Sequence, residues 1–487
     1  MITPLKMTKQ MADFDCDVIV IGAGISGLVS AAELAQQGAK VTVLEASVSV
    51  GGKIQSQQNS GYLTESAASL VLNFRPDVQR FIERHDLNPY KASKSTLSEK
   101  NRYLANNQQL YQVPMSIRKL FASDFWNWQT KLRLMAEPFI PKGGSEQESV
   151  SEFIRRRMGN DVLEKAMEPF VGGTLAGDPD NANAWATLPR LTALERKYGS
   201  ITAGIIINKI LRKKSAMLND SFSFKHGMAS LPNRLAQTEG ITLHTHSMAS
   251  QIQPLKSGWR VEIETRDGPH QKIKTISSRK LIIATPTAAA ADLVKPINAD
   301  MASNLQQIKY APLAVVHTAF KRDEIHHPLD GTGFLIPRGE KKFINGNLWM
   351  SSIFEKRAPT GEVLLSSYVG GARSPEKFNL TDEQLIERCS DDINHFTHSH
   401  AMPEWYKIDR HQQALPLYQN KHLKIMDNIS QIEQQINGLH LLGNYRGGVS
   451  IRDRIIKGTE LAHTIIQELE TQPKSEPVSS SSLAYSS

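Results

Sequence analysis

Cysteine is scarce in this sequence: only Cys16 and Cys389 occur among 487 residues, and no metal-binding spacing can be built from them. A disulfide-stapled fold and a structural zinc site are therefore excluded, and a reducing compartment is the default. Long apolar runs are also missing, since Ile201–Leu211 and Leu281–Val294 fall short of the roughly 18 residues that span a bilayer. With no apolar secretory signal at the N-terminus either, we expect a cytoplasmic protein.

Length and composition indicate a globular enzyme-sized chain. Hydrophobic residues make up 40% and charged residues 22%, which excludes wholesale disorder and a fibrous repeat. The net charge of +8 is compatible with nucleic acid, anionic lipid or an acidic small molecule as a partner. Because the positive charges are scattered, with short clusters only at 155–157 and 212–214, we expect no nucleic-acid partner and leave a peripheral membrane contact open.

A strand–helix–strand unit opens the chain. Residues 17–21 (DVIVI) are a β-branched run typical of a buried parallel strand, and 40–44 (KVTVL) are a second one. Between them, the pattern of residues 28–37 predicts a helix, which ends at Gly38. The order predicts a βαβ unit at the start of an α/β fold.

The turn inside this unit carries the pattern Gly-x-Gly-x-x-Gly. Gly22 permits a tight turn, Gly24 lets a pyrophosphate approach the backbone, and Gly27 allows the helix to pack closely on the strand. Ser26 lies in the same turn, where free N–H groups of the helix N-terminus attract phosphate. Glu45 ends the second strand and is the acceptor expected for a ribose diol.

A second glycine pair follows closely and favours FAD over NAD. Gly51, Gly52 and Lys53 come soon after Glu45, and this spacing resembles the FAD signature of the flavin amine oxidase superfamily. No cysteine lies near the C-terminal glycine loop, so the predicted FAD is bound without a covalent link.

The C-terminal glycine loop supports the same cofactor. It precedes a helical pattern from about 450 to 470, whose N-terminus and backbone N–H groups would stabilise negative charge on a reduced flavin. The residues predicted to contact the cofactor there are Gly443, Asn444, Gly448, Val449 and Ser450.

Several further segments resemble the protoporphyrinogen oxidase family of flavin enzymes, in a match that runs from about Asp17 to Glu468. They are Glu168–Gly173 with Ala176–Pro179, Leu194–Glu195 with Gly199–Ile201, Phe224–Leu231, Gly333–Pro337, Ser351–Phe354 with Arg357–Pro359, Gly370–Gly371 and Gly443–Ser450. The blocks at 168–201 and 333–371 are far more specific than the glycine turn.

The resemblance implies an α/β fold of the p-hydroxybenzoate hydroxylase type. It has a Rossmann-like FAD-binding domain, a substrate domain with a mixed sheet, and a helical insertion that contacts membrane in some members. The implied division is a tail at 1–14, FAD-binding segments at 15–90, 222–298 and 425–470, a helical insertion at 91–215, a substrate domain at 299–424 and a disordered tail at 471–487.

The reaction implied by the resemblance is dehydrogenation of protoporphyrinogen IX to protoporphyrin IX, in haem biosynthesis, with dioxygen as acceptor. The chemistry is the flavin's, so no catalytic side chain and no metal are expected. By the same resemblance Arg102 pairs with a substrate propionate, Trp349 stacks on the macrocycle and Leu335 forms an apolar wall. The oligomeric state is left open, a homodimer included.

One departure from the family keeps the substrate open. Where the family has Gly-Pro-Asn/Asp-Ser after an acid, this chain has Ser66-Ala67-Ala68-Ser69 after Glu65. A related flavin oxidase acting on coproporphyrinogen, an amine or a secondary metabolite is therefore an alternative. A non-catalytic FAD- or porphyrin-binding protein is another.

Overall fold

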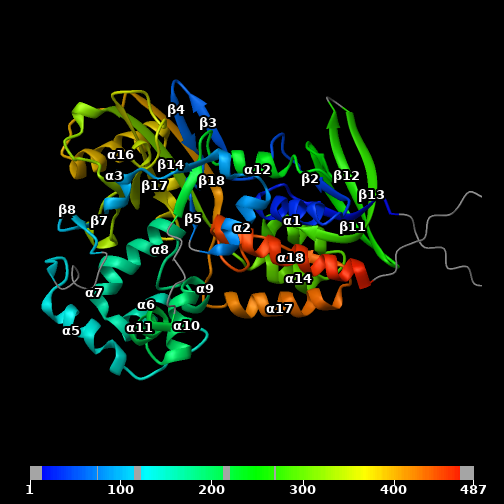
Figure 1. The fold of residues 1–487 in the computed structure, drawn as a ribbon, viewed down its shortest axis with the longest axis horizontal. Coiled ribbons are helices and arrows are strands. Elements are labelled where there is room, and N and C mark those ends of the chain that lie inside the picture. The colour runs from blue at the N-terminus through cyan, green and yellow to red at the C-terminus, as the bar shows by residue number, and fades with distance from the viewer. Residues whose placement is uncertain (1–13, 74, 115–121, 212–219, 268–269, 472–487) are drawn as a thin grey trace, which may run out of the picture.

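The described part of the chain comprises two large sheets and a helical segment (Figure 1). It is a computed structural model that describes residues 14–73, 75–114, 122–211, 220–267 and 270–471. The two predicted tails lie outside these residues except for Phe14 and Thr471. The α/β fold class predicted from the sequence is confirmed.

The first sheet contains the predicted βαβ unit. Its order is β10-β2-β1-β13-β12-β11, with β19 paired to β13, and the pairs among β10, β2, β1, β13 and β19 are parallel. The bounds are β1 Cys16–Ile21, β2 Val41–Leu44, β10 Ile241–His244, β11 Ser247–Leu255, β12 Gly258–Asp267, β13 His270–Ile283 and β19 Leu439–Leu441. All of β2 and nearly all of β1 are buried, as expected of parallel strands covered on both faces.

Helices cover both faces of this sheet. Val18 and Val20 pack in one core cluster with α1 and α18, whereas Ile19 and Ile21 pack in another with α13, α14 and α17. Alternate side chains of β1 thus belong to two different hydrophobic cores, one on each face of the sheet. The bounds are α1 Ile25–Gln36, α2 Pro76–Arg84, α12 Ser230–Leu235, α13 Thr287–Val294, α14 Ala299–Gln306, α17 His422–Gln435 and α18 Ile451–Thr471.

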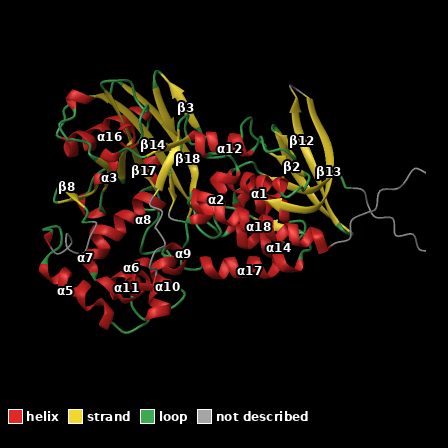
Figure 2. Ribbon diagram, in the orientation of Figure 1, coloured by secondary structure: helices red, strands yellow, loops and turns green. Residues whose placement is uncertain are grey.

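The second sheet is mostly antiparallel and has the order β18-β14-β17-β16-β15-β7-β8. Figure 2 shows its strands β14, β17 and β18 beside helix α16. Only its β15–β7 pair is parallel. Helix α16 (Asp382–Thr397) packs its apolar side against one face. The strands are β7 Asn101–Asn106, β8 Gln109–Gln112, β14 Tyr310–Lys321, β15 Gly331–Leu335, β16 Gly346–Trp349, β17 Glu362–Gly370 and β18 Trp405–Pro416.

Short elements link the two sheets. Strands β3 and β4 form a hairpin, and β5, β9 and β6 form a small antiparallel sheet. Their bounds are β3 Ser56–Asn59, β4 Tyr62–Glu65, β5 Val71–Asn73, β6 Lys91–Ser93, β9 Asp220–Phe224, α3 Thr96–Lys100 and α15 Met350–Ile353, with single turns η1 Asn88–Tyr90, η4 Arg322–Glu324, η5 Arg338–Glu340 and η6 Pro375–Asn379.

The start of the helical segment differs from the prediction. The sequence predicts helices from residue 91, but β6, β7 and β8 occupy part of 91–112, and β7 and β8 belong to the second sheet. In β7, Tyr103 and Ala105 pack on the α16 side and Leu104 on the other, so pairing with β15 gives this polar stretch its strand character. The helical insertion therefore begins after β8.

The helices of this segment are held by a buried ion pair. Arg157 and Glu137 are both fully buried and bonded to each other, and Glu137 also accepts hydrogen bonds from the Ser200 hydroxyl and from two N–H groups at the start of α11. The elements are α5 Trp128–Ala136, η2 Glu137–Phe139, α6 Val150–Met158, α7 Asn160–Val162, the π-helical turn η3 Leu163–Met167, α8 Glu168–Leu175, α9 Ala184–Thr187, α10 Pro189–Tyr198 and α11 Ile201–Leu211. Among the helices described, none combines the length and apolarity needed to cross a bilayer.

Candidate functional site

The turn after β1 requires glycine at two positions. Gly22 has φ +104°, and a Cβ on it would lie 3.1 Å from the backbone of Ala284. A Cβ on Gly27 would lie 2.1 Å from the carbonyl oxygen of Gly22. By contrast, a Cβ on Gly24 would meet no atom within 4 Å, although Gly24 caps α1 just before the buried Ser26. The helix N-terminus at Gly24 therefore faces open space, as a phosphate site requires.

Glu45 lies beside this turn. Its carboxylate accepts hydrogen bonds from the N–H of Ala23 at 2.8 Å and from the N–H of Ser47 at 2.9 Å. These two bonds fix the carboxylate at the end of β2, and each oxygen keeps a further lone pair for a hydroxyl donor.

The second glycine pair lies against the first. The N–H of Gly51 donates to the carbonyl oxygen of Ala23 at 2.7 Å, and Gly24 and Gly51 form an isolated parallel bridge. A Cβ on Gly52 would lie 3.5 Å from the Cα of Gly24. Two bare stretches of backbone thus line one cradle at the carboxyl ends of β1 and β2, where open α/β sheets bind ligands.

The charge and polarity of the cradle fit a dinucleotide. Lys53 is half-buried, has no carboxylate partner among the described residues, and its ammonium lies 5.4 Å from the centre of the Tyr310 ring. Burial lowers the pKa of Lys53 to about 8. The buried hydroxyl of Thr285, beside Gly22, has no hydrogen-bond partner in the structure. An unpaired cation and an unpaired hydroxyl are the groups that a phosphate-bearing ligand would satisfy.

The C-terminal glycine loop is fixed in place by Tyr418 and Arg454. The Tyr418 hydroxyl donates to the carbonyl oxygen of Asn444 at 2.6 Å and accepts from the N–H of Gly448 at 3.0 Å. The buried guanidinium of Arg454 donates to the carbonyl oxygens of Gly443 and Arg446. Ser450 caps α18 through Asp453, and the preceding residue, Val449, is half-buried. The loop follows β19, so it lies at the same sheet edge as the cradle.

The inner face of the second sheet, defined here as the face opposite α16, carries two of the predicted substrate residues. Arg102 and Leu335 both point to it, because their neighbours Tyr103 and Phe334 pack on the α16 side. Arg102 is exposed and Leu335 half-buried. The structure therefore places the predicted anchor and the predicted wall on one surface.

Trp349 is not on that surface. It is fully buried on the α16 side, with ring centres 5.4 Å from Tyr103 and 4.9 Å from His327. Its packing supports a core role. Leu348 and Tyr368 do point to the inner face, and neither was predicted from the sequence as a substrate-binding residue. Alternation within Gly346–Trp349 places Leu348 and Trp349 on opposite faces, but it does not say which face α16 covers.

Tyr368 connects the inner face to the segment beside the cradle. Its hydroxyl lies 3.4 Å from the hydroxyl of Ser69, and burial raises its pKa. At the other end of this segment the Ser66 hydroxyl donates to the carbonyl oxygen of Lys53 at 3.2 Å. The divergent stretch 66–69 thus runs from the glycine cradle to the second sheet.

Helix α8 packs over the same face. A Cβ on Gly173 would lie 2.5 Å from the Leu335 side chain, so the helix approaches as closely as glycine permits. Glu168 pairs with Arg373 and accepts a hydrogen bond from the N–H of Arg338 at 2.9 Å. The segment Glu168–Gly173 therefore attaches the helical segment to the second sheet.

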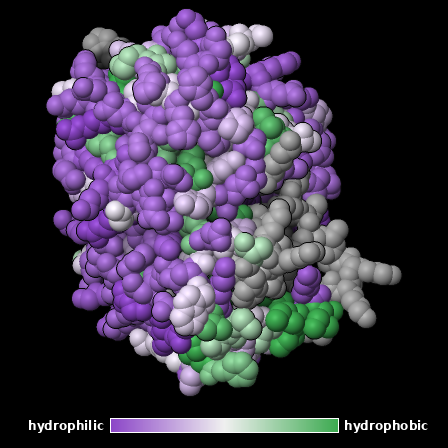
Figure 3. All heavy atoms as spheres, turned by 90° about the vertical axis from the view of Figure 1, so that its left-hand side faces the viewer, coloured by the Kyte–Doolittle hydropathy of each residue, from purple (hydrophilic) through white to green (hydrophobic). Residues whose placement is uncertain are grey.

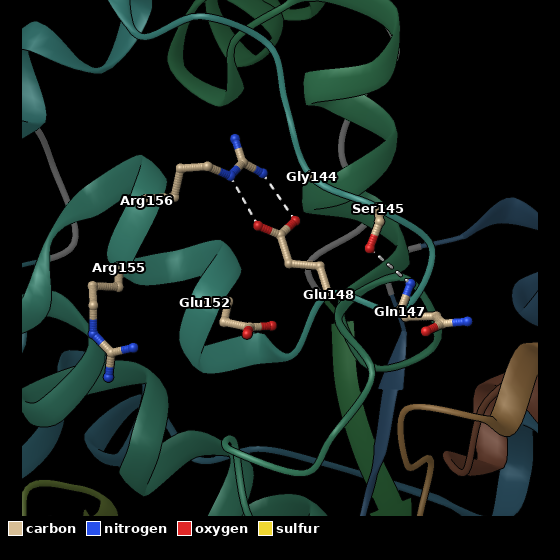
Figure 4. Close-up of a pocket in the computed structure, with 7 residues that line it drawn as sticks. All are labelled: Gly144, Ser145, Gln147, Glu148, Glu152, Arg155 and Arg156. Atoms are coloured by element: carbon tan, nitrogen blue, oxygen red, sulfur yellow. Dashed lines mark hydrogen bonds and ion pairs between the residues drawn. The ribbon is translucent and has the colours of Figure 1, made fainter.

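A hollow of about 700 Å³ on the helical segment lies apart from this region (Figure 4). Its central cation, Arg156, is already paired with Glu148 at 2.8 Å and with Glu195 at 2.7 Å. These carboxylates neutralise the Arg156 guanidinium, so this cation is not available to an anionic ligand. Among the described residues, no cluster of three or more His, Cys, Asp or Glu is placed to hold a metal ion.

Comparison with known proteins gives consistent matches along the chain. The family model described as "Flavin containing amine oxidoreductase" matches residues 25–466. Protoporphyrinogen oxidase 2 of Arabidopsis thaliana is 30% identical over 93% of this chain and 94% of its own. Coproporphyrinogen III oxidase of Staphylococcus aureus is 27% identical over 95% of this chain and 100% of its own. A crystal structure from Exiguobacterium sp. 255-15, provisionally assigned as a protoporphyrinogen oxidase, matches the fold with a TM-score of 0.76 at 20% identity, covering 94% of this chain and 100% of that one.

Proposed function

Because this chain belongs to the family of flavin containing amine oxidoreductases, we propose that it oxidises protoporphyrinogen IX to protoporphyrin IX with dioxygen as electron acceptor. Its cofactor is FAD, and the proposed attachment is non-covalent. The observation that carries the proposal is the joint placement of the glycine cradle, the 66–69 segment and the inner face, together with relatives named for porphyrinogen oxidation.

In this proposal the cradle holds FAD by its adenosine and diphosphate portions. Gly24 and the N-terminus of α1 receive the diphosphate, Glu45 accepts hydrogen bonds from the ribose, and Lys53 supplies a half-buried positive charge. When bound, FAD supplies the two-electron acceptor for the dehydrogenation. The glycine loop fixed by Tyr418 and Arg454 would place the backbone of this loop beside the ligand.

The inner face then holds the porphyrinogen. Leu335 and Leu348 supply an apolar wall for a flat macrocycle, and Tyr368 offers an aromatic surface where the wall approaches the 66–69 segment. Arg102 is the proposed anchor for a carboxylate arm, since a guanidinium binds a carboxylate through two hydrogen bonds. These side chains position the substrate and exclude water, while the electrons pass to the cofactor.

The test measures both cofactor and turnover. The purified protein should show the absorbance of an oxidised flavin, release FAD on acid precipitation, and produce porphyrin fluorescence from protoporphyrinogen IX faster than the spontaneous rate. Coproporphyrinogen III is run in parallel because one group of relatives is named for it. If the protein binds FAD but forms porphyrin no faster than the spontaneous reaction, the oxidase proposal is refuted. The alternative of a non-catalytic FAD-binding protein would then hold.

We also propose that the helical segment contacts a lipid surface. Apolar side chains of α5, η2 and α11 are exposed together, and α11 and α5 both contact η2. Figure 3 shows apolar side chains gathered at the lower edge of this side of the molecule. The patch consists of Trp128, Leu132, Met135, Phe139, Ile205, Ile206, Ile207 and Ile210. Phe139 is 87% exposed, so an interfacial position would bury a large apolar surface.

A further inference from the structure

Lys94 occupies a tightly held position between β6 and α3. Its neighbour Ser95 donates from its N–H to the carbonyl oxygen of Ile353 at 2.9 Å and from its hydroxyl to that of Ser352 at 2.5 Å. The Ser95 hydroxyl also caps α3 through the N–H of Ser98 at 3.1 Å. The backbone beside Lys94 is therefore fixed against α15, the short helix that follows β16, the strand that carries Leu348.

Arg102 is fixed just beyond the same short helix. The side chain of Asn101 donates to Asp330 at 2.8 Å, and the hydroxyl of Tyr103 donates to the same carboxylate at 2.6 Å. With Tyr103 buried on the α16 side, Arg102 must point to the inner face. Both residues thus adjoin one edge of that face, and α3 itself packs on β15.

These two cations lie near each other without an acidic partner. Neither forms an ion pair with a carboxylate of the described residues, and Lys94 is half-buried. Burial and, after it, the charge of Arg102 lower the pKa of Lys94, while Glu99 on α3 acts in the opposite direction. A nearby positive charge disfavours the charged form of Lys94, and an anion bound between Lys94 and Arg102 would offset this effect.

Apolar side chains pack next to Lys94. Ala92, two residues before Lys94, packs with Leu348 in one hydrophobic cluster. A third cation on the inner face, Lys407, is already paired with Asp409 at 2.8 Å. The unpaired positive charge on this face is therefore concentrated at Lys94 and Arg102.

We propose that Lys94 and Arg102 form a two-cation site that binds two neighbouring carboxylate arms of the substrate, with Leu348 against the ring between them. This inference rests on the proposed function and specifies its substrate class: a porphyrinogen with two carboxylate arms rather than four. Lys94 stands in this site as a second binding residue beside Arg102.

The test uses stable porphyrins as probes. Binding of protoporphyrin IX and of its dimethyl ester to the FAD-loaded protein is followed by fluorescence quenching in one detergent buffer. The wild type should bind the diacid at least about tenfold more tightly than the ester, since two charge-assisted contacts are lost in the ester. Lys94→Gln and Arg102→Gln should each weaken diacid binding about tenfold and leave ester binding unchanged.

A matched control is Lys295→Gln, which removes one exposed lysine outside the second sheet and should leave both affinities unchanged. Unfolding midpoints and FAD content establish that each variant is folded. Diacid binding unchanged in Lys94→Gln, or coproporphyrin III bound more tightly than protoporphyrin IX by the wild type, would overturn the two-cation site. Failure of the wild type to bind any porphyrin would instead refute the proposed function itself.

Discussion

The hydroxyl groups of Tyr368 and Ser69 lie 3.4 Å apart although 299 positions separate the two residues in the sequence. Tyr368 belongs to the inner face of the second sheet, and Ser69 ends the segment that starts beside the glycine cradle. This contact is where the proposed substrate surface meets the cofactor-binding half of the molecule. Ser69 itself matches the family pattern, and the departure lies in the three residues before it, Ser66, Ala67 and Ala68.

Substitution of Tyr368 separates the role of the ring from that of the hydroxyl. Tyr368→Phe keeps the aromatic surface and loses one long hydrogen bond, so we expect kcat/KM to stay within about threefold of wild type. Tyr368→Ala removes the surface and should raise KM at least about tenfold, because an aromatic contact is lost. Steady-state kinetics on protoporphyrinogen IX measure both. A large defect in Tyr368→Phe would contradict the role as a wall.

Gly24 allows a test of the cradle that spares the fold. Because a Cβ there would meet no atom within 4 Å and the backbone has φ −70° and ψ 171°, Gly24→Val is compatible with the folded chain. The new side chain would occupy the space predicted for the diphosphate. We expect the unfolding temperature of the apoprotein to be unchanged and FAD affinity to fall at least tenfold.

The control for this variant is Gly339→Val, which also places its Cβ in open space but lies far along the chain in η5. It should retain FAD, as judged from the flavin absorbance of the purified protein. Full FAD content in Gly24→Val would mean that the diphosphate does not approach this backbone.

Glu137 should make stability depend on pH in the acid range. Burial alone would raise its pKa, but hydrogen bonds from the Ser200 hydroxyl, from the N–H groups of Thr202 and Ile201 and from Arg157 outweigh burial and lower the pKa to about 2. Because the pKa is lowered in the folded state, the Glu137 carboxylate stabilises the fold fully above its ordinary pKa of 4.5. This stabilisation is lost as the pH falls toward 2.

Glu137→Gln tests this directly. The substitution leaves the fully buried Arg157 without its main partner, and breaking such a pair typically costs about 3–5 kcal/mol. Urea unfolding at pH 7 should show a loss of that order, and the difference from wild type should shrink at pH 3. An equal loss at both pH values would show that the carboxylate charge does not matter.

The βαβ unit could be predicted from sequence because its determinants are local. A β-branched run, a glycine turn and a second β-branched run constrain the backbone within 30 residues or so, whatever the rest of the chain does. The secondary structure of residues 91–112 could not be predicted in this way. Its strands are short and partly polar: β7 pairs with β15, more than 200 residues away in sequence, β6 pairs with β9, and β8 pairs with β7, so tertiary pairing decides their structure.

The candidate site was predictable only in part for the same reason. Arg102 and Leu335 were found through a family resemblance, and alternation about Tyr103 and Phe334 puts both on one face. Trp349 and Leu348 are adjacent in sequence but lie on opposite faces. The residue that points toward the substrate is the one on the side that α16 leaves uncovered. The sequence of the strand does not say which side that is.

The apolar patch on α5, η2 and α11 gives the last prediction. Ile206 and Ile210 are one helical turn apart and are 47% and 62% exposed, so glutamate at both positions should leave the core intact. We expect Ile206→Glu with Ile210→Glu to reduce cosedimentation with vesicles of neutral and anionic lipid at least about fivefold, because apolar burial drives interfacial binding. The control Ile273→Glu changes an isoleucine that is 61% exposed on β13, away from the patch, and should bind vesicles like wild type. Unchanged vesicle binding by the double variant, together with a shift from dimer to monomer in sedimentation velocity, would assign the patch to a second copy of the chain instead of lipid.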